Sequence, residues 1–560
     1  MLLACGMAAG CAGDAARSFA PVPLSDLPPI DIDAVVAHTR ELASDRYEGR
    51  APGGAGEDLT VAYLEGQFRG MGLAPGAPDG TFIQRVPLVG ITATPAPLVV
   101  GGAGEPVSFA WRTDVVAATR RVAESVAVAD SEIIFVGYGT VAPEFGWDDY
   151  KGVDVAGKTL VMLVNDPPVR SMSSSSGLDP RMFGGNAMTY YGRWTYKYEI
   201  GAAKGAAGVL LIHETEAAGY PFDVVQNSWT GEQFDLAGTD QHAGRVAIEG
   251  WLSLDAGRRM LTLAGQDLDA LRRAAASPDF KPVPLGLRAN MTLENKLRTI
   301  DSRNVIARLD GSDPSLKDEA VVYMAHWDHL GVGEPFEGDA IYNGARDNAV
   351  GTAGMLEIAR SFLRLEPAPR RSILFAAVTA EEQGLLGSRH YTTEPSVPMA
   401  KTAAVINIDT LNVHGRTSDL TLIGHGASDL DRYVQDALRE QGRTAIPDPN
   451  PEAGSFYRSD HFSFARQGVP ALFPDKGLTY VGRPEDFGVR MRQEYVKNFY
   501  HRPDDELTAD WDMSGAAEDL LVFLAVGYRV AQTTALPEWA PDNEFSAIRE
   551  ASLAADRRPR

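Results

Sequence analysis

Short, almost wholly apolar runs alternate with helical patterns in the second half of the chain. The runs at 320–325, 373–378 and 404–408 are typical of strands that are buried on both faces of a mostly parallel sheet. Between the first two runs, apolar residues of the segment 349–362 recur at the spacing i, i+3, i+4, i+7, which indicates one buried helix face. We therefore predict an α/β fold, with a mostly parallel central sheet flanked by helices.

The first half of the chain has a different pattern. Residues 30–73 read as mixed and helical, and the β-rich runs that follow are short and separated by turn residues. These runs lie at 82–89, 133–136, 159–164 and 208–213. Since 560 residues exceed the usual length of one domain, we expect more than one folded unit.

Ionisable residues follow each of the three apolar runs of the second half. His326 and Asp328 come after the first run, Glu381 and Glu382 after the second, and Asp409 after the third. In open α/β sheets, ligands bind beyond the carboxyl ends of the strands. We therefore expect these side chains to form one site.

Two further residues complete the candidate set: Asp347, where a loop enters the helix 349–362, and His501, which stands among later acidic residues. The two cysteines, Cys5 and Cys11, both lie near the start, so the candidate site contains no thiolate. Imidazoles and carboxylates without thiols are typical of a hydrolytic zinc or manganese site. Five such residues exceed what one catalytic metal requires, so two metals that share a carboxylate are expected.

These motifs together resemble those of a known family. In order and approximate spacing, the chain is similar to the clan MH dizinc exopeptidases, such as the bacterial leucyl aminopeptidases, aminopeptidase Y and the glutamate carboxypeptidases. The motifs that carry the resemblance are His326-x-Asp328, Gly344-x-x-Asp347-Asn348, Glu381-Glu382, Asp409 and Tyr500-His501. Characterised relatives also imply a cis peptide bond between Asp347 and Asn348.

The resemblance implies a role for each ligand candidate. One metal would be held by His326 and Asp409, the other by Glu382 and His501, and Asp347 would bridge the two. Two Zn²⁺ per chain are expected, with Mn²⁺ or Co²⁺ as alternatives.

The resemblance also implies roles for residues around the metals. Glu381 would be the general base, and Tyr500 would stabilise the tetrahedral oxyanion. Asp328 would orient the ligating ring of His326. Asp460 and His461 lie in a segment that would line the site near the substrate; His461 is an alternative last ligand, although the pattern around His501 fits better.

An inserted unit interrupts the similarity, and it resembles the protease-associated domain of many family members. The resemblance rests on Gly137-Tyr-Gly139, the segments 146–151 and 158–165, and the residues from Tyr190 to Gly208. The predicted division is a signal- or lipoprotein-like segment with a Pro-rich tether (1–29), the first part of the peptidase domain (30–118), the inserted domain (119–289), the catalytic part (290–535) and a C-terminal tail (536–560).

Composition and the N-terminal residues bear on location and partners. The formal net charge is −23, and no run of Lys and Arg could track phosphates, which excludes nucleic acid as a partner. No apolar stretch is long enough for a transmembrane helix.

Ala8-Ala-Gly-Cys11 resembles a lipoprotein signal box, which predicts export to the periplasm or the outer membrane with a lipid anchor at Cys11, or secretion. Because no basic residue precedes the short apolar run, an untargeted N-terminus remains the alternative.

The predicted function is that of a metal-dependent exopeptidase on peptide substrates, with an aminopeptidase favoured. A carboxypeptidase or dipeptidase of the glutamate carboxypeptidase type is the first alternative, followed by a one-zinc glutaminyl cyclase and a non-catalytic receptor-like protein. A carboxypeptidase needs a cation for the free carboxylate of its substrate. Arg346, Arg458 and Arg466 lie in or near the motifs, but the sequence assigns them only to the surface or to a supporting position. Oligomeric state is not predicted.

Overall fold

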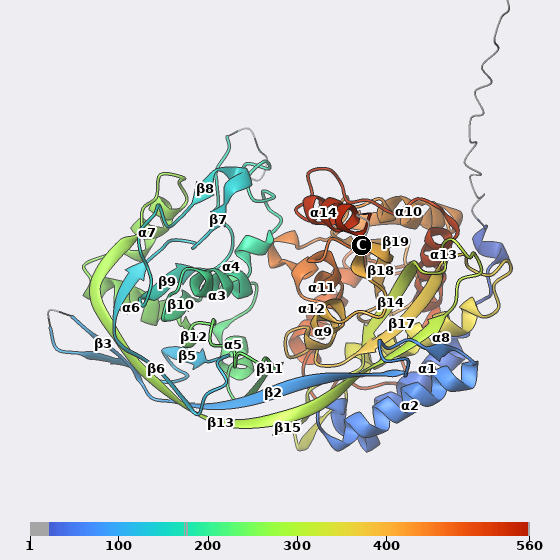
Figure 1. Ribbon diagram of the computed structural model, residues 1–560, viewed down its shortest axis with the longest axis horizontal. Helices are drawn as coiled ribbons and strands as arrows, with labels where there is room; N and C mark the ends of the chain where they lie inside the picture. The colour runs from blue at the N-terminus through green and yellow to red at the C-terminus, as the bar shows by residue number, and fades with distance from the viewer. Residues whose placement is uncertain (1–21, 103, 173, 175–176, 558–560) are drawn as a thin grey trace, which may run out of the picture.

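The computed structural model describes residues 22–102, 104–172, 174 and 177–557. Cys5 and Cys11, and with them the predicted lipoprotein-like segment, lie outside these residues. Two lobes stand on a pair of long curved strands, β2 (Ile83–Pro95) and β13 (Val283–Leu309), as Figure 1 shows. The pair is antiparallel, from Val305 opposite Ile83 to Leu293 opposite Pro95.

The catalytic lobe contains the predicted mostly parallel sheet. At its centre β14 (Ala320–His326) runs parallel to β17 (Ser372–Val378) on one side and to β18 (Thr402–Asn407) on the other. The three strands coincide with the three apolar runs, which confirms the predicted fold class. The sheet continues beyond β18 through β21 (Ala471–Asp475), β19 (Asp419–Ile423) and β20 (Thr444–Pro447), and beyond β17 through β13.

Both faces of this sheet are covered, because alternate side chains of β14 enter different hydrophobic cores. Val321, Tyr323 and Ala325 pack in one core, and Val322 and Met324 pack in the other. The first core is covered by α1 (Ile32–Leu42), α2 (Ala55–Met71), α8 (Val350–Phe362), α10 (Leu430–Glu440) and α13 (Ser514–Gln532). The second is covered by α9 (Leu386–Thr393) and α11 (His461–Ala465), with α14 (Ser546–Asp556) beside them.

The second lobe has its own sheet and two cores of its own. Its parallel strands are β6 (Ser125–Phe135), β9 (Thr159–Leu163), β10 (Gly208–Ile212) and β12 (Ile248–Leu252), and β5 (Val115–Ala118) is antiparallel to β12. Its helices are α3 (Trp194–Ala203), α4 (Thr215–Ala218), α5 (Phe222–Ser228), α6 (Leu254–Leu263) and α7 (Leu268–Ala275). The first core also takes in Leu98, Val100 and Phe109 from the hairpin of β3 (Leu98–Gly101) and β4 (Val107–Phe109). The division at 119 and 289 stays a prediction.

Several short strands, one irregular helical turn and one further helix are also used below or lie between these elements. They are β1 (Ala74–Pro75), β7 (Val141–Ala142), β8 (Trp147–Asp148), β11 (Glu232–Leu236), β15 (Gly331–Phe336), β16 (Asp339–Tyr342), the irregular helical turn η5 (Ala345–Ala349) and α12 (Phe487–Asn498). No helix within the described ranges is both long and apolar enough to cross a membrane.

Candidate metal centre

The candidate site lies where the three parallel strands end. His326 is the last residue of β14 and stands opposite Val378, the last residue of β17. Glu381 and Glu382 follow β17, and Asp409 follows β18 by two residues. The parallel register therefore brings side chains from three separate chain segments to one edge of the sheet.

Asp347 reaches the same edge from the turn η5. Its backbone N–H donates to the buried carboxylate of Asp505, over 3.1 Å. Gly344 begins this turn at a φ of 55°, and a Cβ there would come within 2.1 Å of the Asp347 carbonyl oxygen and 2.5 Å of the His329 ring. Only glycine fits this position. The peptide bond between Asp347 and Asn348 is cis, as predicted.

The structure brings all five ligand candidates together. The two carboxylate oxygens of Asp347 face different imidazoles: Oδ1 lies 3.3 Å from Nε2 of His326, and Oδ2 lies 3.5 Å from Nε2 of His501. Nε2 of His326 also lies 3.4 Å from Asp409, and Nε2 of His501 lies 2.9 Å from Glu382. Asp347 thus lies close to both imidazoles, and each imidazole also lies close to one further carboxylate.

This arrangement fits divalent cations. A neutral imidazole nitrogen and a carboxylate oxygen both present lone pairs, so their close approach requires a proton or a metal ion between them. Burial lowers the pKa of His501, but the carboxylates of Glu382 and Asp347 outweigh burial and raise it to about 10. Burial likewise lowers the pKa of His326, yet acidic neighbours, Glu381 foremost, raise it well above its usual value. The site therefore attracts positive charge, and its nitrogen and oxygen donors suit zinc.

The two adjacent glutamates lie in different electrostatic environments. Burial, together with Asp409 and Glu382, raises the pKa of Glu381 well above its usual range, although His326 opposes this. Burial also acts to raise the pKa of Glu382, but His501 and His329 outweigh it and lower it. One carboxyl group is thereby suited to hold a proton and the other to remain ionised.

Asp328 contacts two members of the site. Its Oδ1 accepts the backbone N–H of Glu381 at 3.1 Å and lies 3.8 Å from Nδ1 of His326. Nδ1 of His326 is closer to the Asp328 backbone oxygen, at 3.1 Å. Asp328 is fully buried, and this burial raises its pKa to about 8. Its position therefore orients both the His326 ring and the backbone that carries Glu381.

The remaining predicted residues differ in how far their side chains are exposed to solvent. Tyr500 is 45% exposed, and its ring stacks on that of His501 at 3.8 Å. Asp460 and His461 are fully buried. Burial raises the pKa of Asp460, while the His461 ring lies 4.5 Å from that of Phe473, in apolar surroundings.

Several supporting residues were missed by sequence reasoning. His329, to which no role was assigned, places Nδ1 2.7 Å from Oε1 of Glu382. Ser459 donates from Oγ to Oδ2 of Asp409 at 2.7 Å. The buried guanidinium of Arg50 donates to backbone carbonyl groups of Trp327 and Gly344, among others. Of these, His329 stands beside Asp328 and Ser459 beside Asp460, two residues that had been singled out, whereas Arg50 lies far from any motif.

Comparison with known proteins gives consistent matches. The chain is similar to aminopeptidase NAALADL1 of Mus musculus, with 33% identity over 172 residues that cover 29% of this chain and 21% of that protein. It is also similar to aminopeptidase YwaD of Bacillus subtilis (strain 168), with 33% identity over 202 residues that cover 34% of this chain and 37% of that protein. This chain therefore matches well under two thirds of the length of either relative.

A solved structure shares the fold. It is that of an aminopeptidase from Aneurinibacillus sp. strain AM-1, with a TM-score of 0.50 and 19% identity, covering 91% of this chain and 96% of that chain. Residues 304–525 match peptidase family M28. All five ligand candidates fall within the matched residues.

Proposed function

We propose that this chain is an aminopeptidase that removes N-terminal residues from peptides with the help of two zinc ions. The observation that carries the proposal is the position of the Asp347 carboxylate, which presents one oxygen to His326 and the other to His501. One metal would be held by His326 and Asp409 and the other by Glu382 and His501, with Asp347 shared. Mn²⁺ or Co²⁺ would suit the same donors.

The residues of the chain divide the chemistry between them. Bound zinc supplies a Lewis acid and lowers the pKa of water from 15.7 to about 7. Glu381 takes the proton of the attacking water and delivers it to the leaving amine, a role for which a raised pKa is suited. Tyr500, exposed beside His501, donates its phenol hydrogen to the developing oxyanion.

The similar proteins support cleavage at the N-terminus. Both named relatives, NAALADL1 of Mus musculus and YwaD of Bacillus subtilis, are aminopeptidases. These names favour removal of N-terminal residues over trimming from the C-terminus.

A pair of arginines favours a second candidate function, that of a dipeptidase or carboxypeptidase. Arg193 precedes α3 in the second lobe, and Arg458 precedes Ser459 in the catalytic lobe. Burial and the nearby charge of Arg458 lower the pKa of Arg193 to about 10. Nε of Arg193, and Nε and Nη2 of Arg458, are buried without a hydrogen-bond partner among the described residues. Arg458 is also close enough to Tyr500 for its charge to favour the ionised phenol and so to act to lower the pKa of Tyr500. Such a pair suits the free carboxylate of a short peptide.

End-resolved digestion tests both functions. Zinc-loaded protein from about Ala20 onward is given matched peptides with free or acetylated N-termini and with free or amidated C-termini, and the products are identified by mass. Loss of residues from free N-termini only supports the aminopeptidase, whereas trimming from the C-terminus contradicts it. No product from zinc-loaded protein would favour the receptor-like alternative.

The arginine pair has a sharper test. Arg193→Met and Arg458→Met should each raise KM for dipeptides with a free carboxylate and leave KM for the amidated dipeptides unchanged. Arg181→Met, at an exposed arginine of the second lobe paired with Asp179, is the matched control. Equal effects on acids and amides would contradict carboxylate recognition.

Two further assignments belong to the same proposal. The second lobe is a protease-associated domain that helps to form the substrate entrance, so changes in this lobe should alter the length of peptide accepted. The chain is exported and anchored through acylated Cys11, so Cys11→Ser should release it from the membrane fraction. An unchanged length preference after changes in the second lobe would contradict the first assignment. An unchanged amount of Cys11→Ser in the membrane fraction would contradict the second.

A further inference from the structure

A cavity lies beside the turn that carries Asp347. It has a volume of about 310 Å³ and is lined by Arg346, the residue directly before Asp347, together with residues of α12 and of the loops around His414 and Asp510. None of the five ligand candidates lines it, and neither does Glu381. Its size is at the lower end of the range for small-molecule sites.

The guanidinium group of Arg346 is the unusual feature of this cavity. Arg346 is 6% exposed, and its Nε and Nη2 have no hydrogen-bond partner in the described part of the chain. Nη1 lies 3.5 Å from Nε2 of His414, and the group stacks at 3.9 Å on the ring of Tyr495. A buried cation without an anionic partner is costly, so the free edge of this guanidinium indicates an anionic ligand.

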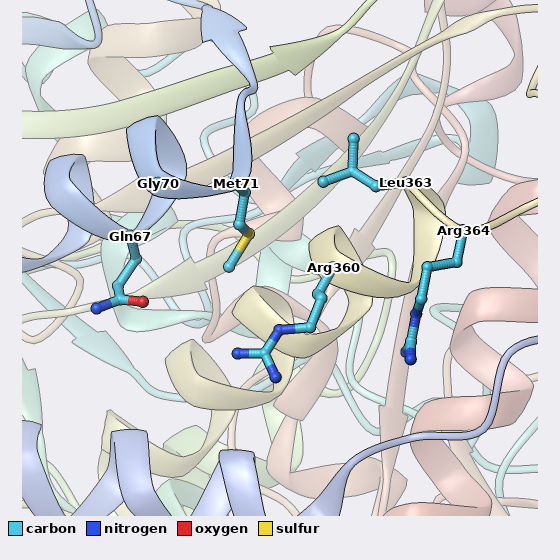
Figure 2. Close-up of a pocket in the computed structure, with 6 residues that line it drawn as sticks. All are labelled: Gln67, Gly70, Met71, Arg360, Leu363 and Arg364. Carbon is cyan, nitrogen blue, oxygen red and sulfur yellow. The ribbon is translucent and has the colours of Figure 1, made fainter.

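Another cavity of the chain shows the contrast. Figure 2 shows Arg360 and Arg364 on the wall of a cavity of about 490 Å³ between α2 and α8. There Glu357 lies 3.4 Å from Arg360 and 3.3 Å from Arg364, so both guanidinium groups already have a carboxylate partner. Arg346 has no such partner at its free edge.

Two acidic residues on another wall of the cavity suit an ammonium group. Asp510 and Asp512 both line the cavity, and hydrogen bonds from Thr508 and Ser514 respectively lower their pKa values and keep them ionised. Burial, with Arg346 the next cause, lowers the pKa of His414 to about 4, so this ring is neutral near pH 7.

Apolar and further charged groups complete the lining. Phe487 and Met491 of α12 add an apolar wall. Arg483 and Glu494 add one charge of each sign. Cationic, anionic and apolar walls around one small cavity match a small zwitterion with an apolar side chain.

We propose that this cavity binds a free amino acid, with its carboxylate on Arg346, its ammonium group at Asp510 and Asp512, and its side chain against Phe487 and Met491. The backbone N–H groups of Arg346 and Asp347 both donate to Asp505, so the ligand acts on the turn that holds Asp347. Under the proposed function the ligand is the reaction product, and the cavity is a product-binding site separate from the metals.

Calorimetric titration of the zinc-loaded chain with L-leucine tests the inference. The wild type should bind one equivalent more than Arg346→Met, and L-leucinol and 4-methylpentanoate, which lack the carboxylate and the amine respectively and contain no amide bond, should bind the cavity at least tenfold more weakly. Arg360→Met, which alters the cavity of Figure 2, is the matched control and should keep the extra equivalent.

An equal number of equivalents in the wild type and Arg346→Met would overturn the inference. If the Tm of Arg346→Met is also lower at that unchanged stoichiometry, Arg346 is a support of the fold. Because binding needs no peptide cleavage, a chain that cleaves no peptide but loses one equivalent on Arg346→Met would contradict the proposed function and leave this inference intact.

Discussion

Nδ1 of His329 lies 2.7 Å from Oε1 of Glu382, and the other oxygen of that carboxylate faces His501. His329 is fully buried and contacts the carboxylate oxygen of Glu382 that does not face His501. We expect His329→Ala to weaken zinc binding by about 10- to 100-fold, as is usual when the partner of a metal ligand is lost. Competition with a chelator measures this affinity. His425→Ala, at a partly exposed histidine, is the control, and an unchanged zinc affinity in His329→Ala would refute the role.

Glu381→Gln should lower kcat by about 10²- to 10⁴-fold, because the amide cannot accept the proton of the attacking water. The zinc content should remain that of the wild type, since Glu381 is not among the ligand candidates. Asp347→Asn provides the contrast, because loss of the shared carboxylate should reduce metal content and rate together. Metal analysis and peptide hydrolysis on the same samples distinguish the two, and normal turnover by Glu381→Gln would mean that the base is another group.

Gly344→Ala should destabilise the chain and reduce zinc content. The new Cβ would meet the Asp347 carbonyl oxygen and the His329 ring, and the positive φ alone costs about 1–2 kcal/mol for a residue with a side chain. Gly442→Ala is the control, since Gly442 also has a positive φ, of 71°, but nothing within 4 Å of the added atom. Thermal unfolding should show a larger loss for Gly344→Ala, and equal losses would argue against a close fit around Gly344.

His461 should make the stability of the chain depend on acid. Burial lowers the pKa of this ring to about 3, whereas its unfolded value is 6.5. The unfolded chain therefore binds a proton more readily between these values, so the free energy of unfolding falls by up to about 1.4 kcal/mol per pH unit as the pH drops from about 6.5 toward 3. His461→Leu should have a shallower decline over that window in denaturant titrations. Parallel declines would show that His461 is not the group that titrates.

The strand ends and the ligand candidates were predictable because their signals are local. An apolar run followed at once by His or Asp is visible in a short window, and the parallel arrangement then brings such residues to one edge. The cis bond between Asp347 and Asn348, by contrast, was predicted only from the resemblance to characterised relatives.

The supporting contacts were not predictable because each joins distant segments. His329 stands three residues after His326, yet its partner Glu382 comes from the end of another strand. The direction of the Arg346 side chain depends on Tyr495 of α12, and that of Arg193 depends on how two lobes meet. The residues next to these in the sequence do not indicate which distant segments will lie against their side chains.

The long strand β13 also has a mechanical consequence. It runs for 27 residues, pairing with β6 in one lobe and with β17 in the other, while β2 accompanies it between them. Sliding of one lobe past the other would break this ladder, whereas bending it would preserve every hydrogen bond. The shared strand therefore fixes the register of the two lobes, and unfolding of either lobe would remove backbone hydrogen-bond partners from a strand on which the other lobe also depends.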